Sequence, residues 1–156
     1  MKLLLNAALA LSLLASPALA QPADGWVVVK AGNAFTFEAP PDLKVVPVQG
    51  IDSLVGQYAG DRFSLQFDYG LYSNTLDDLR GDSRFQREAV TIDGRPAEIF
   101  TGPGPNEACP FLVALYMVVE PANRVLLQMG GCANGYAGVV QMQRLMRSVR
   151  FTAPPA

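Results

Sequence analysis

Residues 109–132, CPFLVALYMVVEPANRVLLQMGGC, contain two apolar runs separated by the four residues EPAN. Apolar runs that flank a short loop with proline and asparagine are typical of a β-hairpin. If residues 120–123 form the loop, Val119 faces Arg124, and Cys109 lies almost opposite Cys132 at the open end of the hairpin. The segment therefore predicts two long antiparallel strands joined by a disulfide bond.

Cys109 and Cys132 are the only two cysteines of the chain. A bond between them closes a loop of about 24 residues, which stabilises the fold by about 3 kcal/mol in the chain-entropy model. Their spacing differs from the C-x-x-C spacing of redox-active pairs. We expect a structural bridge, and such bridges persist in oxidising compartments.

Residues 1–20 have the pattern of a secretory signal peptide. Lys2 precedes an apolar run over residues 3–14, and Ala18-Leu19-Ala20 forms a small-x-small cleavage site before Gln21. The run is too short to span a bilayer comfortably, and no cysteine near the cleavage site could carry a lipid. We therefore expect a secreted or periplasmic protein that starts at about Gln21 and has no membrane anchor.

The composition excludes several function classes. The chain has no histidine, which excludes Ser-His-carboxylate and Cys-His catalysis and zinc sites built on histidine. The formal net charge of −2 includes no basic block, so no nucleic-acid partner is indicated. No motif indicates a cofactor or a catalytic set, and the enzymatic option that remains is carboxylate chemistry.

The rest of the chain predicts a central antiparallel sheet of about six to eight strands. Phe63, Leu65, Phe67 and Tyr69 alternate with polar residues, which is typical of a half-buried strand. Asp93-Gly94 separates two further runs and is a strong hairpin signal. The candidate strands are residues 26–30, 33–38, 43–48, 53–59, 62–69, 85–92, 95–100, 111–119 and 124–129.

Three connections have distinct patterns. Gly60-Asp61 is expected to form a two-residue turn, and residues 102–106, GPGPN, are expected to form a loop that is neither helix nor strand. Residues 70–84 are the least regular segment. Within them, Ser73 or Asn74 is expected to cap a short helix that extends through Leu79.

After Cys132 the spacing of the apolar residues changes to that of an amphipathic helix. One face of the predicted C-terminal helix is apolar and the other is polar, so the helix should lie on the sheet, with Asn134 as its N-cap. We expect one α+β domain over residues 33–152, an N-terminal segment at 21–32 and a disordered tail at 153–156. The apolar face comprises Val139, Met142, Leu145, Met146 and Val149.

Three stretches resemble the PsbP-like group of small domains, which includes an extrinsic photosystem subunit and a nuclear GTPase-binding relative. They are residues 34–41 (AFTFEAPP), 92–97 (IDGRPA) and 145–151 (LMRSVRF). The resemblance implies an α-β-α sandwich around a central antiparallel sheet and a binding role without catalysis. It implies no functional residue.

Two groups of side chains are candidate sites. Asp77, Asp78 and Asp82 form the densest acidic cluster, a weak candidate for calcium because their spacing does not match the twelve-residue calcium loop. Aromatic residues beside irregular segments are typical of binding surfaces, although Tyr69 and Phe111 could instead pack in the core. The aromatic candidates are Tyr69, Tyr72, Phe111 and Tyr136.

The sequence thus predicts an exported domain that binds an envelope protein or another envelope component without catalysis. Two alternatives stay open. One is a small carboxylate-based enzyme, which would require a concave site with two or more buried titratable groups. The other is a carrier that holds a small apolar ligand between the helix and the sheet.

Overall fold

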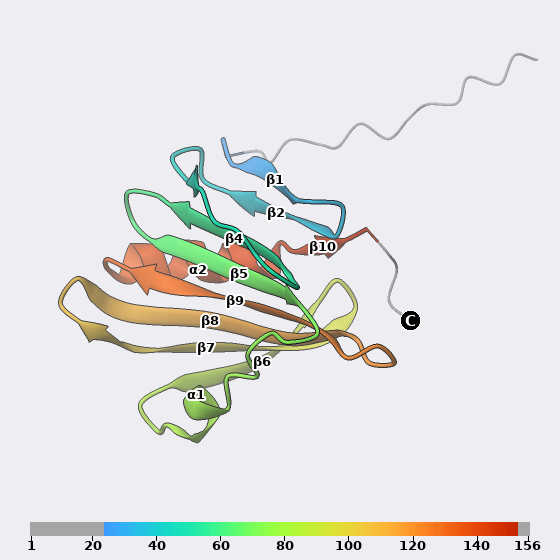
Figure 1. The fold of residues 1–156 in the computed structure, drawn as a ribbon. Helices are drawn as coiled ribbons and strands as arrows, with labels where there is room; N and C mark the ends of the chain where they lie inside the picture. The colour runs from blue at the N-terminus through green and yellow to red at the C-terminus, as the bar shows by residue number, and fades with distance from the viewer. Residues whose placement is uncertain (1–23, 153–156) are drawn as a thin grey trace, which may run out of the picture.

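Ten strands and two helices follow one another in the computed structural model, which describes residues 24–152 (Figure 1). Seven strands form one antiparallel sheet in the order β3-β4-β5-β9-β8-β7-β6, and three form a smaller sheet in the order β1-β2-β10. The predicted α+β class is therefore confirmed. The elements are β1 Val27–Ala31, β2 Phe35–Ala39, β3 Lys44–Val46, β4 Leu54–Ala59, β5 Ser64–Gly70, α1 Asp77–Gly81, β6 Gln86–Ile92, β7 Arg95–Asn106, β8 Cys109–Glu120, β9 Val125–Ala133, α2 Tyr136–Arg147 and β10 Arg150–Phe151.

The large sheet has an inner face, which packs against α2 and the small sheet, and an outer face on its other side (Figure 1). Strand β5 shows the expected alternation. Leu65 and Phe67 are buried on the inner face, whereas Ser64 and Gln66 are exposed on the outer face. Successive strand residues point to opposite faces, so the two faces carry different chemistry.

Helix α2 packs on β8, β9 and β2 through its apolar face. Met142, Leu145 and Met146 are fully buried there, which confirms the predicted amphipathic helix. The predicted cap is wrong. The Asn134 side chain donates to the Asp61 carbonyl at 3.1 Å instead of capping α2, because Asn134 is held against the β4–β5 connection, and the N-cap is Gly135.

The small sheet joins the two ends of the described chain. β2 pairs with β1 on one side and with β10 on the other, and Thr36 lies opposite Arg150. Phe35 of β2 is buried, and its ring packs edge-on against Phe67 with centroids 5.1 Å apart. Trp26, directly before β1, is also buried, so part of the N-terminal segment belongs to the packed structure.

The Cys109–Cys132 disulfide is present, with the two Cα atoms 5.1 Å apart. The register of the hairpin differs from the expected one. Cys132 lies opposite Leu112, and Glu120 lies opposite Val125, so the loop comprises residues 121–124. Arg124 takes up the left-handed conformation that closes this loop, at φ +56°.

The expectation that residues 102–106 form a loop is wrong, because β7 continues through them beside β8. Gly102 lies opposite Leu112, and Pro103 lies opposite Phe111. Pairing of β7 with β6 ends at Thr101, so beyond it the strand has one open side, where a residue without an N–H is tolerated. A Cβ atom at Gly104 would lie 1.7 Å from the carbonyl oxygen of Cys109, so this close approach requires glycine.

The two short hairpin turns differ in how well the sequence predicts them. Asp93 and Gly94 have φ values of +49° and +76° and place Ile92 opposite Arg95, as expected for a two-residue turn. The β4–β5 turn is shifted by one residue. Gly60 N–H donates to the Phe63 carbonyl at 3.0 Å, which makes residues 61–62 the centre of the turn.

Within residues 24–152, no helix is long and apolar enough to cross a membrane. The predicted signal peptide at residues 1–20 and the predicted tail at 153–156 lie outside the described residues.

Candidate functional site

Helix α1 lies over part of the outer face (Figure 1). Leu76, just before the helix, and Leu79 within it pack with Phe100 of β7 and with Ala114 and Tyr116 of β8. This small apolar cluster is separate from the main core on the inner face. It leaves parts of the outer face on either side of α1 uncovered.

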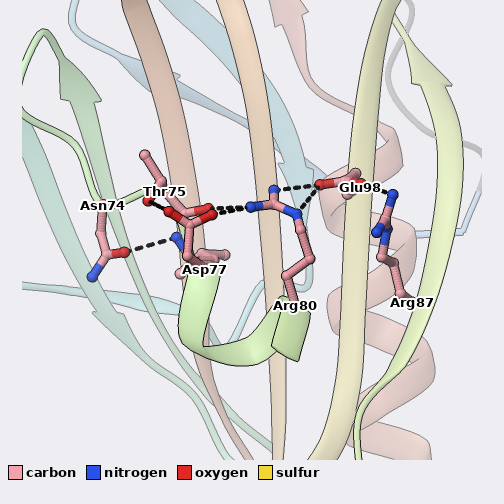
Figure 2. Close-up of polar contacts among 7 residues, drawn as sticks. Asn74, Thr75, Asp77, Arg80, Arg87 and Glu98 are labelled. Carbon is pink, nitrogen blue, oxygen red and sulfur yellow. Dashed lines mark hydrogen bonds and ion pairs between the residues drawn. The ribbon is translucent and has the colours of Figure 1, made fainter. Parts of the chain in front are cut away.

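An ion-pair network anchors α1 to the sheet (Figure 2). Arg80 pairs with Asp77 on the helix and with Glu98 of β7, where an Nη2–Oε2 distance is 2.5 Å. Glu98 also pairs with Arg87 of β6 at 2.6 Å. The guanidinium of Arg80 lies 5.3 Å from the centroid of the Tyr116 ring. The hydrogen bonds that Arg80 donates to Glu98 raise the pKa of Arg80, so this anchor keeps its charge.

Local side-chain hydrogen bonds hold the segment directly before α1. Leu76 N–H donates to Asn74 Oδ1 at 2.7 Å (Figure 2), and Ser73 is buried with its hydroxyl donating to Asp68 Oδ1 at 3.0 Å. Leu76 is the N-cap, at φ +57° and without a side-chain cap bond, and the helix begins at Asp77. The predicted short helix is present, but neither Ser73 nor Asn74 is its N-cap.

Two hollows on the outer face share three glutamines. Gln57 of β4 lies opposite Gln66 of β5, and Gln128 of β9 is the next outward residue diagonally across from Gln66. One hollow measures about 250 Å³ and extends toward α1, and the other measures about 210 Å³ and extends toward Val48. We call this pair of hollows the glutamine groove. Its other lining residues include Val55, Ser64, Asp68, Leu76, Leu79, Leu112, Gly130 and Cys132.

A third hollow, of about 430 Å³, lies on the outer face beyond α1, over β6, β7 and β8. Most of the side chains around it are apolar, and Glu98 and Tyr116 are the polar ones. We call it the apolar hollow. It is lined by Ala89, Val90, Pro96, Ala97, Glu98, Tyr116, Met117, Val118 and Pro121.

The four aromatic candidates do not gather on one surface. Tyr69 packs inward against Phe35, with ring centroids 5.9 Å apart, and burial raises the pKa of its phenol. Tyr72 and Tyr136 are 75% and 77% exposed. Tyr69 lies opposite Leu127 near one end of the sheet, whereas Phe111 lies opposite Ala133 near the other end.

Two of the three acidic candidates form ion pairs with arginines. Asp77 pairs with Arg80, and Asp82 pairs with Arg84 at 2.6 Å. The hydrogen bonds from Arg84 lower the pKa of Asp82 to about 2. Asp78 is exposed, and nowhere in residues 24–152 do three acidic or cysteine side chains converge in a way that could hold a metal ion.

The sequence-based candidates do not include Gln57, Gln66 and Gln128. Alternation along residues 62–69 does place Gln66 on the polar face of its strand. Gln57 lies on the preceding strand, β4. Gln128 lies on β9, which is separated from β5 in the sequence by α1, β6, β7 and β8. A single-strand pattern carries no information about such pairing.

No protein-family model matches the chain, and no curated protein is significantly similar to it. The chemistry of the outer face is therefore the basis for a functional proposal.

Proposed function

We propose that the protein is an exported binding domain that recognises a component of the cell envelope through the outer face of its large sheet. The observation that carries this proposal is the difference between the two faces. Most of the inner face is covered by α2 and the small sheet, apart from a hollow of about 230 Å³ between α2 and strands β6 and β7, whereas the glutamine groove and the apolar hollow open on the outer face. Concave surfaces with a few placed polar groups are the usual location of binding sites.

The disulfide supports export. Cys109 and Cys132 are bonded to each other, and structural disulfides are typical of proteins in oxidising compartments. The signal-peptide pattern of residues 1–20 predicts the same destination.

The charges around the hollows favour binding without catalysis. Glu98, in the apolar hollow, is held by ion pairs to two arginines, so its two carboxylate oxygens are already engaged within the protein. Asp68, in the glutamine groove, accepts a hydrogen bond from Ser73. No pair of closely placed carboxylates with different surroundings lines these three hollows, and carboxylate enzymes commonly use such a pair.

The proposal can be tested by purifying the full chain from its own envelope and recording native mass spectra. Val118→Lys and Gln66→Lys each place a charge on the outer face, and Val140→Lys places one on the half-exposed side of α2 as the matched control. We expect a retained envelope component with the wild type and the control, and its loss with at least one outer-face variant. A chain that retains nothing, or retains the component equally in all variants, contradicts the proposal.

The apolar hollow favours a second candidate, a carrier of a small apolar ligand. Met142, Leu145 and Met146 pack the space between α2 and the sheet, so the apolar hollow on the outer face is the better place for such a ligand. An apolar small molecule in the mass spectra that Val118→Lys removes and Gln66→Lys keeps would favour this candidate.

A further inference from the structure

The three glutamines of the groove present unused amides to solvent. Among the described residues, no hydrogen bond engages the side chains of Gln57, Gln66 or Gln128, and no buried polar side-chain atom lacks a partner. The amides therefore face water. Each carries two N–H donors and a carbonyl oxygen that can accept two hydrogen bonds, so the groove offers both kinds of group side by side.

The walls and floor of the groove are apolar. Leu76 and Leu79 line it from the α1 side, and Leu112 and Val55 line it from the sheet. Gly130 lies opposite both Gln66 and Ala114, and its missing side chain leaves the floor open. A ligand that fits this surface has hydrogen-bonding groups along one side and C–H groups along another.

The charges of the groove disfavour an anionic ligand. No lysine or arginine is among the residues that line its two hollows. The carboxylate of Asp68, at one end, accepts a hydrogen bond from Ser73. An anionic ligand would have no counter-charge in the groove, and it would lose the energy of its hydration without compensation.

The strands beneath the groove offer little room for recognition by strand addition. β5 and β9 each have a neighbour on both sides, and β3 pairs with residues 57–59 of β4, so only residues 54–56 of β4 have an open side. An extended peptide gains most of its affinity from a free strand edge, and the groove offers only this short one. Gln57 and Gln66 lie opposite each other on strands about 4.8 Å apart, whereas Gln66 and Gln128 form a diagonal pair about 7–8 Å apart, so the three flexible amides can reach different hydroxyl groups of one saccharide.

We propose that the glutamine groove binds an uncharged saccharide, with the three amides bonding to its hydroxyl groups and the leucines contacting its C–H faces. The inference rests on the proposed function, in which the outer face binds an envelope component. It names the chemical class of that component.

Side-chain amide signals in two-dimensional ¹H–¹⁵N NMR spectra report on these residues directly. The labelled full-length protein is titrated with neutral oligosaccharides of glucose, galactose, mannose and N-acetylglucosamine, and separately with an oligosaccharide that contains glucuronic acid and with an uncharged peptide. We expect at least one neutral oligosaccharide to shift the amide signals of Gln57, Gln66 and Gln128. The glucuronic acid sugar and the peptide should leave them unchanged.

Variants show whether the groove itself binds. Gln66→Ala and Gln128→Ala should each weaken binding about tenfold, the effect of losing one to two hydrogen bonds. Gly130→Val should abolish it, because the new Cβ meets only ordinary contacts, at 3.4 Å, while its methyl groups fill the floor. Gln141→Ala on α2, on the other side of the sheet, is the matched control and should bind as the wild type does.

Three outcomes overturn the saccharide assignment. They are no shift with any neutral oligosaccharide, equal weakening by Gln141→Ala, and tighter binding of the peptide or the acidic sugar. If an envelope component is still retained in the native mass spectra and lost from outer-face variants, the proposed function stands and only the ligand class is wrong. If neither experiment detects a ligand, both are wrong.

Discussion

The guanidinium group of Arg95 lies 4.6 Å from the centroid of the Phe151 ring, so the start of β7 holds the last described strand. Asp93 also takes part, and we call the contacts among Arg95, Asp93 and Phe151 the clamp. Its carboxylate pairs with Arg95 at 3.1 Å and accepts a hydrogen bond from the Phe151 N–H at 2.9 Å. Arg95 is 5% exposed, so its charge is compensated inside the fold.

Replacement of Arg95 should destabilise the protein more than replacement of an exposed arginine. Arg95→Met keeps the length of the side chain but removes the cation beneath Phe151 and leaves Asp93 without its ion pair. We expect the free energy of unfolding to fall by about 2–3 kcal/mol, measured by urea denaturation. Arg62→Met, at an exposed position, is the control and should change it by less than about 0.5 kcal/mol. Equal effects of the two substitutions would contradict the clamp.

Replacement of the two neighbouring glycines of β9 by alanine should have very different effects on stability. A Cβ atom at Gly131 would lie 1.9 Å from the carbonyl oxygen of Ser64, so β5 and β9 would have to move apart. The nearest atoms to a Cβ at Gly130 are 3.4 Å away. Gly131→Ala should therefore lower the free energy of unfolding by about 3 kcal/mol, and Gly130→Ala should change it by less than about 1 kcal/mol. Urea denaturation of both variants checks the contrast, and a tolerated Gly131→Ala would show that the two strands are farther apart.

The disulfide should contribute measurably to stability. Removal of the bond in the double variant Cys109→Ala, Cys132→Ala frees a 24-residue segment in the unfolded chain and should cost about 3 kcal/mol. Chemical denaturation of the variant and of the wild type, with and without reductant, measures this cost. Reductant should lower the stability of the wild type and leave that of the variant unchanged. A loss below about 1 kcal/mol would indicate that the hairpin register alone holds β8 against β9.

Burial of Tyr58 should make the fold sensitive to alkali. Burial raises the pKa of its phenol above the ordinary value of 10, whereas the unfolded chain ionises near that value. Above pH 10 the unfolded state therefore loses its proton before the folded state does, and the free energy of unfolding falls as pH rises. Tyr58→Phe keeps the edge-on contact with Phe37 and should reduce this slope.

Urea denaturation at several pH values between 9 and 11 measures the slope. Tyr72→Phe, at an exposed side chain, is the matched control and should keep the slope of the wild type. Identical slopes for the wild type and Tyr58→Phe would contradict the burial of the phenol.

Local signals predict much of this fold correctly. The turn at Asp93-Gly94 follows from two residues that tolerate positive φ, and the alternation in β5 follows from one sheet face being buried. The disulfide was predictable because the two cysteines flank a single hairpin. In each case the information lies within a short stretch of chain. The resemblance to the PsbP-like domains stays a prediction.

The errors arise where a distant partner decides the local structure. Residues 102–106 read as a loop because of their prolines, but β8 on one side and an open edge on the other accommodate them in β7. Asn134 has the composition of a helix cap, but the carbonyl group of Asp61 binds its side chain. The glutamine groove could not be predicted for the same reason, since it requires β9 to lie beside β5.

The pairing of Thr36 with Arg150 affects the order in which the protein can fold. β2 lacks one of its two neighbours until the last part of the chain has been made, and the inner face stays uncovered until α2 arrives. A chain that emerges N-terminus first therefore cannot close its core while it is still incomplete. This order of folding is compatible with the proposed export, because secretion machinery that moves unfolded polypeptides acts on chains that have not yet closed their core.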